Sequence, residues 1–314
     1  MTRDLALSVS ICLFVAGCQC RPEPSNPDTD RRDDTATPTE TGRLDTGPEP
    51  PCDLPEVEPN NTAEQATPLP LESKACGEFQ APADSDQWAV SVTEEVWLGI
   101  RIDARESGSF ANPAVVLSSP DGLAVLRSDG AETADVDLLF PTTPRELNVL
   151  VLEENQQGSA DGQYFYSILA SVQKAPRTWT VVELEPNDTR PEATVVFDGD
   201  EVFARISDAD DGDYYRVDVP VGRHTLVVAV HGFELGSPAD TVLYLQDSTG
   251  TSPDCISNPS CRFARGQIGF ERDPWLEYTS EGDETLYVRV LPEDGRGSEV
   301  HWYGFELSLT GQDP

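Results

Sequence analysis

One seven-residue pattern occurs twice in this 314-residue chain and constrains its fold more than any other feature. The sequence reads EVEPNNT at 56–62 and ELEPNDT at 183–189, which lie 127 positions apart. The similarity continues beyond this pattern, because DSDQWAVSV at 84–92 aligns with DGDYYRVDV at 211–219 at the same offset. A long collinear match of this kind indicates two copies of one structural unit.

Matches further along keep the same order while their spacing drifts. The offset is 128 for two sets of positions and 139 for a third. At offset 128, Leu98, Ile100 and Ile102 match Leu226, Val228 and Val230, and Leu117 and Gly122 match Leu245 and Gly250. At offset 139, Gly158, Tyr164, Tyr166 and Ile168 match Gly297, Tyr303, Phe305 and Leu307, in that order. The larger offset predicts an insertion in the second copy, around Cys255–Cys261.

Each copy has the pattern of an all-β unit. Trp88, Val90 and Val92 alternate with polar residues, which is typical of a strand with one buried face. Turn sequences interrupt the apolar runs at 120–122, 161–162, 220–222 and 293–295. Many short strands separated by turns predict a β-sandwich. We therefore expect two sandwiches, in residues 51–175 and 176–314, each long enough for its own core.

The N-terminal residues indicate export. A short apolar run at 5–14 ends in VAGC at 15–18, which resembles the bacterial lipobox. This resemblance implies a signal peptide at 1–17, a lipid on Cys18, and anchoring to a membrane through that lipid. The following residue is Gln19 and not Asp, which by the same resemblance favours an outer-membrane lipoprotein. An ordinary secretory signal that ends near a cysteine is the alternative.

The composition of the next segment and the net charge add two expectations. Residues 18–50 are rich in Pro, Thr, Asp and Glu, so we expect a disordered tether. The formal net charge is −36. A chain this acidic repels nucleic acid, and we expect no nucleic-acid partner.

The cysteines fit an oxidising compartment, in which disulfides form. We predict the bridges Cys52–Cys76 and Cys255–Cys261, because each pair is local in the sequence. Cys20 then remains, as a second lipid site, an intermolecular bridge or a free thiol.

The ordered motifs E-P-N-[DN]-T, D-x-D-x-[WY] and Y-x-[FY]-x-[IL] resemble the bacterial pre-peptidase C-terminal domain family. The resemblance covers most of residues 54–172 and 181–310. It implies jelly-roll-like β-sandwiches in an exported protein. Such domains often accompany secreted peptidases, but the residues before the repeats leave room only for a signal and a tether.

The same resemblance implies a calcium site in each copy, because acidic segments of the related collagen-binding domains coordinate calcium. Calcium takes about six to eight oxygen ligands, and the repeated motifs are rich in side-chain oxygens. The candidate ligands are Glu56, Glu58, Asn60, Asn61, Asp84 and Asp86 in the first copy, and Glu183, Glu185, Asn187, Asp188, Asp211 and Asp213 in the second.

A capped turn is the structural alternative for the same motifs. Thr62 to Gln65 and Thr189 to Glu192 fit the capping-box pattern, and Pro and Asn favour turns. This alternative leaves the alternating Glu residues and the D-x-D pair without a role. The sequence DADDGD at 208–213 does not fit an EF-hand, because its Gly comes one position late and Val219 stands where the bidentate Glu belongs.

The sequence carries no recognisable catalytic motif. Its three histidines, His224, His231 and His301, form no zinc-binding pattern, and there is no nucleophile elbow or phosphate-binding loop. We therefore predict a non-catalytic protein that displays two calcium-stabilised modules for binding protein or polysaccharide. A structural subunit of an envelope complex, an accessory of a secreted hydrolase, and a hydrolase with a carboxylate pair are the alternatives. Five aromatic residues are candidates for a binding patch: Trp275, Tyr278, Tyr287, Trp302 and Tyr303. Packing in the core or at a sheet edge is the alternative, and it is favoured for Tyr287 and Tyr303.

Overall fold

The computed structural model describes residues 52–120, 123–127, 135–251, 263–265 and 273–311. Its elements are strands, apart from three short 3-10 helices. In chain order they are β1 (Leu54–Pro55), η1 (Ala63–Gln65), β2 (Thr67–Pro68), β3 (Lys74–Glu78), β4 (Ser85–Val92), β5 (Val96–Asp103), β6 (Pro113–Ser118), β7 (Ala124–Arg127), β8 (Val136–Thr142), β9 (Arg145–Glu153), β10 (Phe165–Gln173), β11 (Val181–Val182), η2 (Arg190–Glu192), β12 (Thr194–Val195), β13 (Glu201–Arg205), β14 (Asp213–His231), η3 (Phe233–Leu235), β15 (Thr241–Asp247), β16 (Phe263–Arg265), β17 (Trp275–Pro292) and β18 (Trp302–Gly311).

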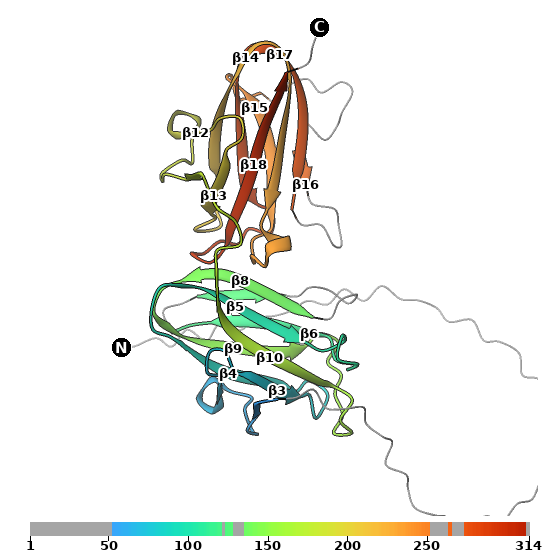
Figure 1. The fold of residues 1–314 in the computed structure, drawn as a ribbon. Helices are drawn as coiled ribbons and strands as arrows, with labels where there is room; N and C mark the ends of the chain where they lie inside the picture. Colours follow the sequence, from blue (N-terminus) through green and yellow to red (C-terminus); the bar gives the residue numbers. More distant parts are fainter. Residues whose placement is uncertain (1–51, 121–122, 128–134, 252–262, 266–272, 312–314) are drawn as a thin grey trace, which may run out of the picture. The chain divides into compact units, whose positions relative to one another are not determined.

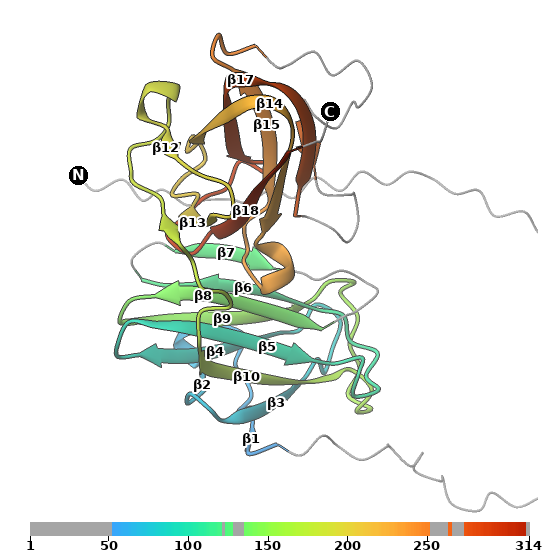
Figure 2. The same cartoon turned by 45° about the horizontal axis from the view of Figure 1, so that its top comes forward.

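The strands β1 to β10 form a β-sandwich, called here the first sandwich. One sheet has the order β1-β3-β10-β5-β8, and the other has the order β2-β4-β9-β6-β7. The two sheets lie face to face (Figures 1 and 2). Trp88, Val90 and Val92 on β4 and Leu98, Ile100 and Ile102 on β5 are buried between them. The alternation seen in the sequence is thus the inward face of each strand, as expected for a strand with one buried face.

The strands β11 to β18, called here the second sandwich, repeat this arrangement with longer strands. β14 pairs through its first half with the second half of β17, and through its second half with β18 and the first half of β17. β14 therefore corresponds to β4 and β5 joined, and β17 corresponds to β8 and β9 joined. Both run the length of the second sandwich in Figure 1. The order of pairings is the same in the two sandwiches, although continuous strands connect the sheets in the second.

The expected turn at 220–222 is a bend within a strand. β14 continues through Pro220 to His231, and its pairing with β17 shifts between Val221 and His224. Gly222 has φ 104°, a conformation that glycine adopts without steric cost. The segment corresponds to the short link between β4 and β5 and carries the chain from one sheet to the other.

The predicted insertion lies between β15 and β17. β6 and β15 correspond at an offset of 128, whereas β8 and β17 correspond at 139. The extra residues therefore fall between these strands, where Cys255 and Cys261 lie. Both cysteines, and the bridge predicted between them, are outside the described residues, as are Cys18, Cys20 and the whole of 1–51. The domain limits 51–175 and 176–314 stay a prediction.

The alignment of the last strand was wrong by two residues. Tyr166 pairs with Gly77 and Tyr303 pairs with Ala204, which occupy equivalent positions on β3 and β13. Tyr166 therefore corresponds to Tyr303, at an offset of 137 and not 139. The cause lies in the loop before the strand, which is two residues longer in the first sandwich. The expected pair Gly158 and Gly297 is correct, because a side chain at either position would collide with the backbone of the equivalent residues Ala81 and Asp208.

The predicted disulfide Cys52–Cys76 is present, with a Cα–Cα distance of 5.8 Å. It ties the segment before β1 to β3. Trp179 and Phe203 occupy the equivalent positions of the second sandwich, and their ring centroids lie 5.7 Å apart. An aromatic contact thus takes the place of the covalent bond.

Candidate metal sites

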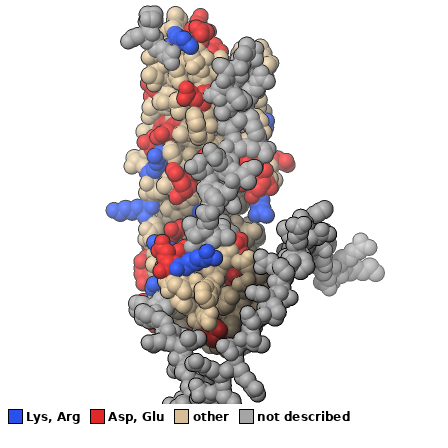
Figure 3. Space-filling model, turned by 90° about the vertical axis from the view of Figure 1, so that its right-hand side faces the viewer, with Lys and Arg blue, Asp and Glu red and all other residues tan. Residues whose placement is uncertain are grey.

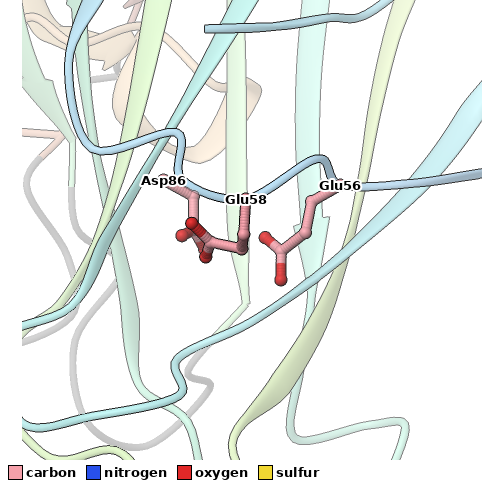
Figure 4. A group of neighbouring side chains, drawn as sticks. All are labelled: Glu56, Glu58 and Asp86. Atoms are coloured by element: carbon pink, nitrogen blue, oxygen red, sulfur yellow. The ribbon is translucent and has the colours of Figure 1, made fainter. Parts of the chain in front are cut away.

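Two groups of three carboxylates gather at equivalent positions of the two sandwiches. The first acidic group consists of Glu56, Glu58 and Asp86, and the second acidic group consists of Glu183, Glu185 and Asp213. In each group, one oxygen from every residue lies within 4.8 Å of the others. Figure 4 shows the carboxylates of Glu58 and Asp86 turned toward each other, with that of Glu56 beside them.

The local fold explains why these side chains meet. The two Glu residues of each group lie on the segment that follows β1 or β11, where the Glu–Pro peptide bond is cis in both copies. Glu56 Oε1 accepts a hydrogen bond from the Glu78 backbone N–H at 2.9 Å, which fixes this segment beside β3. Asp86 lies on β4 and points inward, with no exposed surface. The alternation of the strand therefore presents an aspartate to the glutamates.

Buried hydroxyl groups hold the two aspartates from the other side. Tyr166 donates a hydrogen bond to Asp86 Oδ2 at 2.6 Å, and the Trp88 indole N–H donates to Tyr166 at 2.9 Å. In the second sandwich, Tyr303 donates to Asp213 Oδ2 at 2.5 Å. Sequence reasoning missed this role, because it treated Tyr303 as packing. The repeated D-x-D-x-[WY] and Y-x-[FY] motifs were the available indication.

Tyr215 replaces Trp88 and reaches a glutamate directly. Its hydroxyl lies 2.7 Å from that of Tyr303 and donates to Glu183 Oε2 at 3.1 Å. The second acidic group therefore accepts hydrogen bonds from two tyrosine hydroxyls that also contact each other. The first accepts one from a tyrosine hydroxyl, which in turn accepts one from an indole N–H.

Burial raises the pKa of several of these carboxyl groups. Desolvation is the largest cause in each case, and the charge of a neighbouring carboxylate adds to it. The pKa of Glu56 rises to about 7 and that of Asp86 to about 8. The pKa of Glu183 rises to about 7 and that of Asp213 to about 9. Such groups need either protons or a cation nearby to be stable in the folded chain.

Some buried oxygens of the two groups have no hydrogen-bond partner among the described residues. They are Glu56 Oε2 in the first group, and Asp213 Oδ1 beside Asn187 Oδ1 in the second. Asp213 and Asn187 have no exposed surface. Buried polar atoms are usually paired, so these oxygens mark a place where a cation fits. Each group contains only oxygen donors, without histidine or cysteine, which suits a hard cation.

The remaining candidate ligands lie around these groups and also stabilise loops. Asp84 accepts a hydrogen bond from the Gln80 backbone N–H at 2.7 Å, and Asp211 accepts one from Ser207 N–H at 2.5 Å. Both aspartates still raise the pKa of carboxyl groups in the clusters through their charge. Asn60, Asn61 and Asp188 adjoin the same clusters.

The alternative of a capped turn is correct only in part. Each motif does lead into a 3-10 turn, η1 or η2. The threonine hydroxyls, however, make no hydrogen bond to the backbone of that turn. Thr62 donates to the Gln65 side chain at 3.3 Å, and Thr189 donates to Glu192 at 2.5 Å. The turn orders the end of the motif and leaves its glutamates free to face the aspartate.

Trp302 and Tyr303 are fully buried. The predicted aromatic patch is therefore wrong for Trp302, whereas the packing role favoured for Tyr303 is confirmed. Tyr278 and Tyr287 are half-buried. Trp275 is the exposed member, with 55% of its surface accessible.

The comparisons with known proteins bear on the fold. No protein-family model matches the chain, and no curated protein matches it. Among solved structures, the chain is similar to the pre-peptidase C-terminal domain of a collagenase from Bacillus anthracis, with 16% identity, a TM-score of 0.28, and coverage of 35% of this chain and 99% of that one. It is also similar to the ANXUR2 extracellular domain from Arabidopsis thaliana, with 11% identity, a TM-score of 0.22, and coverage of 78% and 84%. A third similar structure is the CUB1-EGF-CUB2 domain of human MASP-1/3, with 6% identity, a TM-score of 0.20, and coverage of 74% and 99%. Similarity at these levels concerns the β-sandwich fold alone.

Proposed function

We propose that this protein is a non-catalytic lipoprotein of the cell envelope, in which each β-sandwich binds one calcium ion and is displayed for binding protein or polysaccharide. The observation that carries the metal site is the pair of equivalent acidic groups, each with a fully buried aspartate and with an oxygen that lacks a partner among the described residues. The resemblance to pre-peptidase C-terminal domains supports calcium as the ion. The N-terminal sequence supports the lipid anchor.

The chemistry of the ligands favours calcium over other metals. Three carboxylates and an adjoining amide give each site oxygen donors alone, and calcium accepts such donors in flexible geometry. Magnesium demands near-octahedral geometry and keeps several waters, so a preformed carboxylate group suits it less well. The bound ion would hold the segment after β1 or β11 against the strand that carries the aspartate.

The histidines support a non-catalytic role, because each has a structural partner. His224 contacts the Gly222 carbonyl, His231 contacts Glu234, and His301 contacts Ser298.

In Figure 3 the Asp and Glu side chains are spread over the visible face among Lys, Arg and uncharged residues. Among the described residues, no helix is long and apolar enough to span a membrane.

Thermal unfolding with and without calcium tests the metal part of the proposal. We expect the purified protein to melt at a higher temperature in calcium than in EDTA, with a much smaller effect of magnesium. A ligand that binds the folded state at 100 times its Kd adds about 2.7 kcal/mol of stability. Glu185→Gln should reduce the shift, whereas Glu277→Gln, a matched change of an exposed residue on β17, should leave it intact. An equal melting temperature in EDTA and in millimolar calcium would contradict the proposal.

Binding to arrays of glycans and matrix proteins tests the display role against the alternative of a structural subunit. Saturable binding of the calcium-loaded protein supports display. Recovery of the protein only in a stable envelope complex, without binding to any array component, supports the structural alternative.

A further inference from the structure

The two acidic groups are equivalent in position but differ in what neutralises them. We propose, on the basis of the calcium sites proposed above, that the second site binds calcium more tightly and that the second sandwich depends on calcium more strongly. Both sites have an asparagine amide, Asn60 or Asn187, but Asn61 of the first site is replaced by Asp188 in the second. The disulfide beside the first site is also replaced, by an aromatic contact.

In the first sandwich, two amide nitrogens donate hydrogen bonds toward the carboxylates. The orientation of each amide is assigned from its hydrogen-bond partners. The Asn60 amide nitrogen lies 3.3 Å from Asp86 Oδ1 and 3.2 Å from Glu58 Oε2, so it bridges two members of the group. The Asn61 amide nitrogen lies 2.6 Å from the Ser85 carbonyl and 3.2 Å from Asp84 Oδ1. Asn60 therefore donates to two carboxylates of the first acidic group, and Asn61 donates to Asp84 beside it.

The second sandwich differs in charge at the second of these positions. Asn187, the counterpart of Asn60, lies with its amide nitrogen 3.5 Å from Glu183 Oε2. Asp188 stands where the first sandwich has Asn61. It has no amide to donate, and its Oδ1 instead accepts a hydrogen bond from Gly212 N–H at 3.4 Å. Asp188 also adds a negative charge close to Glu185 of the second acidic group.

The attachment of the motif segment differs in the same direction. Cys52–Cys76 fixes the segment before Glu56 covalently to β3, independently of any ion. At the equivalent place, Trp179 packs on Phe203 without a covalent bond. The second sandwich therefore relies more on its acidic group to keep this segment in place.

Calcium binding also requires different rearrangements at the two sites. In the first site, Asn61 donates hydrogen bonds through its amide nitrogen, so it must rotate before its oxygen can face an ion. In the second site, Asp188 offers carboxylate oxygens at this position and adds a negative charge. Calcium affinity rises with the charge of the ligand set. We expect the second site to bind calcium at least ~10-fold more tightly than the first.

Calcium titration by calorimetry, on the purified protein with both sandwiches, tests this inference. Asp86→Asn removes the first site and Asp213→Asn removes the second, so each variant reports the affinity of the other site. Circular dichroism checks that both variants remain folded. The expected result is tight binding in Asp86→Asn and weaker binding in Asp213→Asn. Equal affinities would overturn the inference, and no calcium binding in the wild type would overturn the proposed function itself.

Reciprocal exchange at the exposed positions 61 and 188 gives a second test that does not disturb the core. Asn61→Asp should tighten the first site, and Asp188→Asn should weaken the second, each by several-fold. Affinities that stay unchanged in both exchanges would refute the role assigned to these residues. The melting temperature of Asp188→Asn in EDTA should rise, because the repulsion between Asp188 and Glu185 is removed.

Discussion

Calcium binding should release protons, and the number released follows from the raised pKa values of the acidic groups. Carboxylates that bind a metal must be ionised. Before calcium arrives, the pKa of Asp86 is about 8 and that of Asp213 is about 9, since burial disfavours their charged forms. The pKa of Glu56 and that of Glu183 are each about 7. At neutral pH, a good part of these groups is therefore protonated in the cation-free chain.

The expected stoichiometry can be worked out from these values. At pH 7, the aspartate of each site is at least about nine-tenths protonated and the glutamate is about half protonated. Each calcium ion then displaces about 1.5 protons, or about three for the two sites together. At pH 5 the total rises to about four, and at pH 9.5 it falls below about 0.5.

Isothermal titration calorimetry in paired buffers measures this number directly. The binding enthalpy is recorded at pH 7 in two buffers with different ionisation enthalpies, and the difference gives the protons released per calcium ion. Asp86→Asn and Asp213→Asn, which each disable one site, should roughly halve the total. A binding enthalpy that is independent of the buffer would show that the carboxylates are already ionised, and the argument from burial would then be wrong.

Three further predictions concern stability. In EDTA, the melting temperature should fall as the pH rises from 5 to 9, because the folded chain holds carboxyl protons that the unfolded chain has released; calcium should abolish this fall. Replacing both Cys52 and Cys76 by Ser should destabilise the first sandwich by about 3 kcal/mol in urea unfolding, since the bridge closes a loop of 24 positions. Tyr303→Phe should cost about 1–3 kcal/mol in EDTA by leaving Asp213 without its donor, and unchanged unfolding of this variant would contradict the assigned hydrogen bond.

The sequence predicted most of the fold because its repeated pattern carries a physical requirement. Alternation at Trp88, Val90 and Val92 predicts one buried face, and the structure buries all three. The same pattern occurs in the second copy, so two sandwiches followed from one observation. The sequence did not predict that β14 is continuous through this segment, because Pro220 and Gly222 are typical of a turn whether the chain reverses or only bends. The pairing partners that decide between these outcomes are distant in the sequence.

The candidate sites show the same division. The alternating glutamates and the D-x-D pair identified the carboxylates, because like charges at this density need a common partner. The sequence could not separate Asp86, which enters the group, from Asp84, which caps the Gln80 loop. Both choices are compatible with the local spacing, and only the direction of β4 distinguishes them. The misaligned last strand hid the tyrosines for a similar reason, because the loop before Tyr166 differs in length from the loop before Tyr303.

The equivalence of Tyr166 and Tyr303 connects the core to the sites. Each tyrosine is fully buried and directs its hydroxyl at the aspartate, so the phenol ring packs in the core while its polar end meets the acidic group. A buried hydroxyl needs a partner, and a buried carboxylate needs a donor. Each copy meets both requirements with one contact. The acidic groups are therefore extensions of the two cores, and a cation bound there would act on the stability of the whole sandwich and not on the surface turn alone.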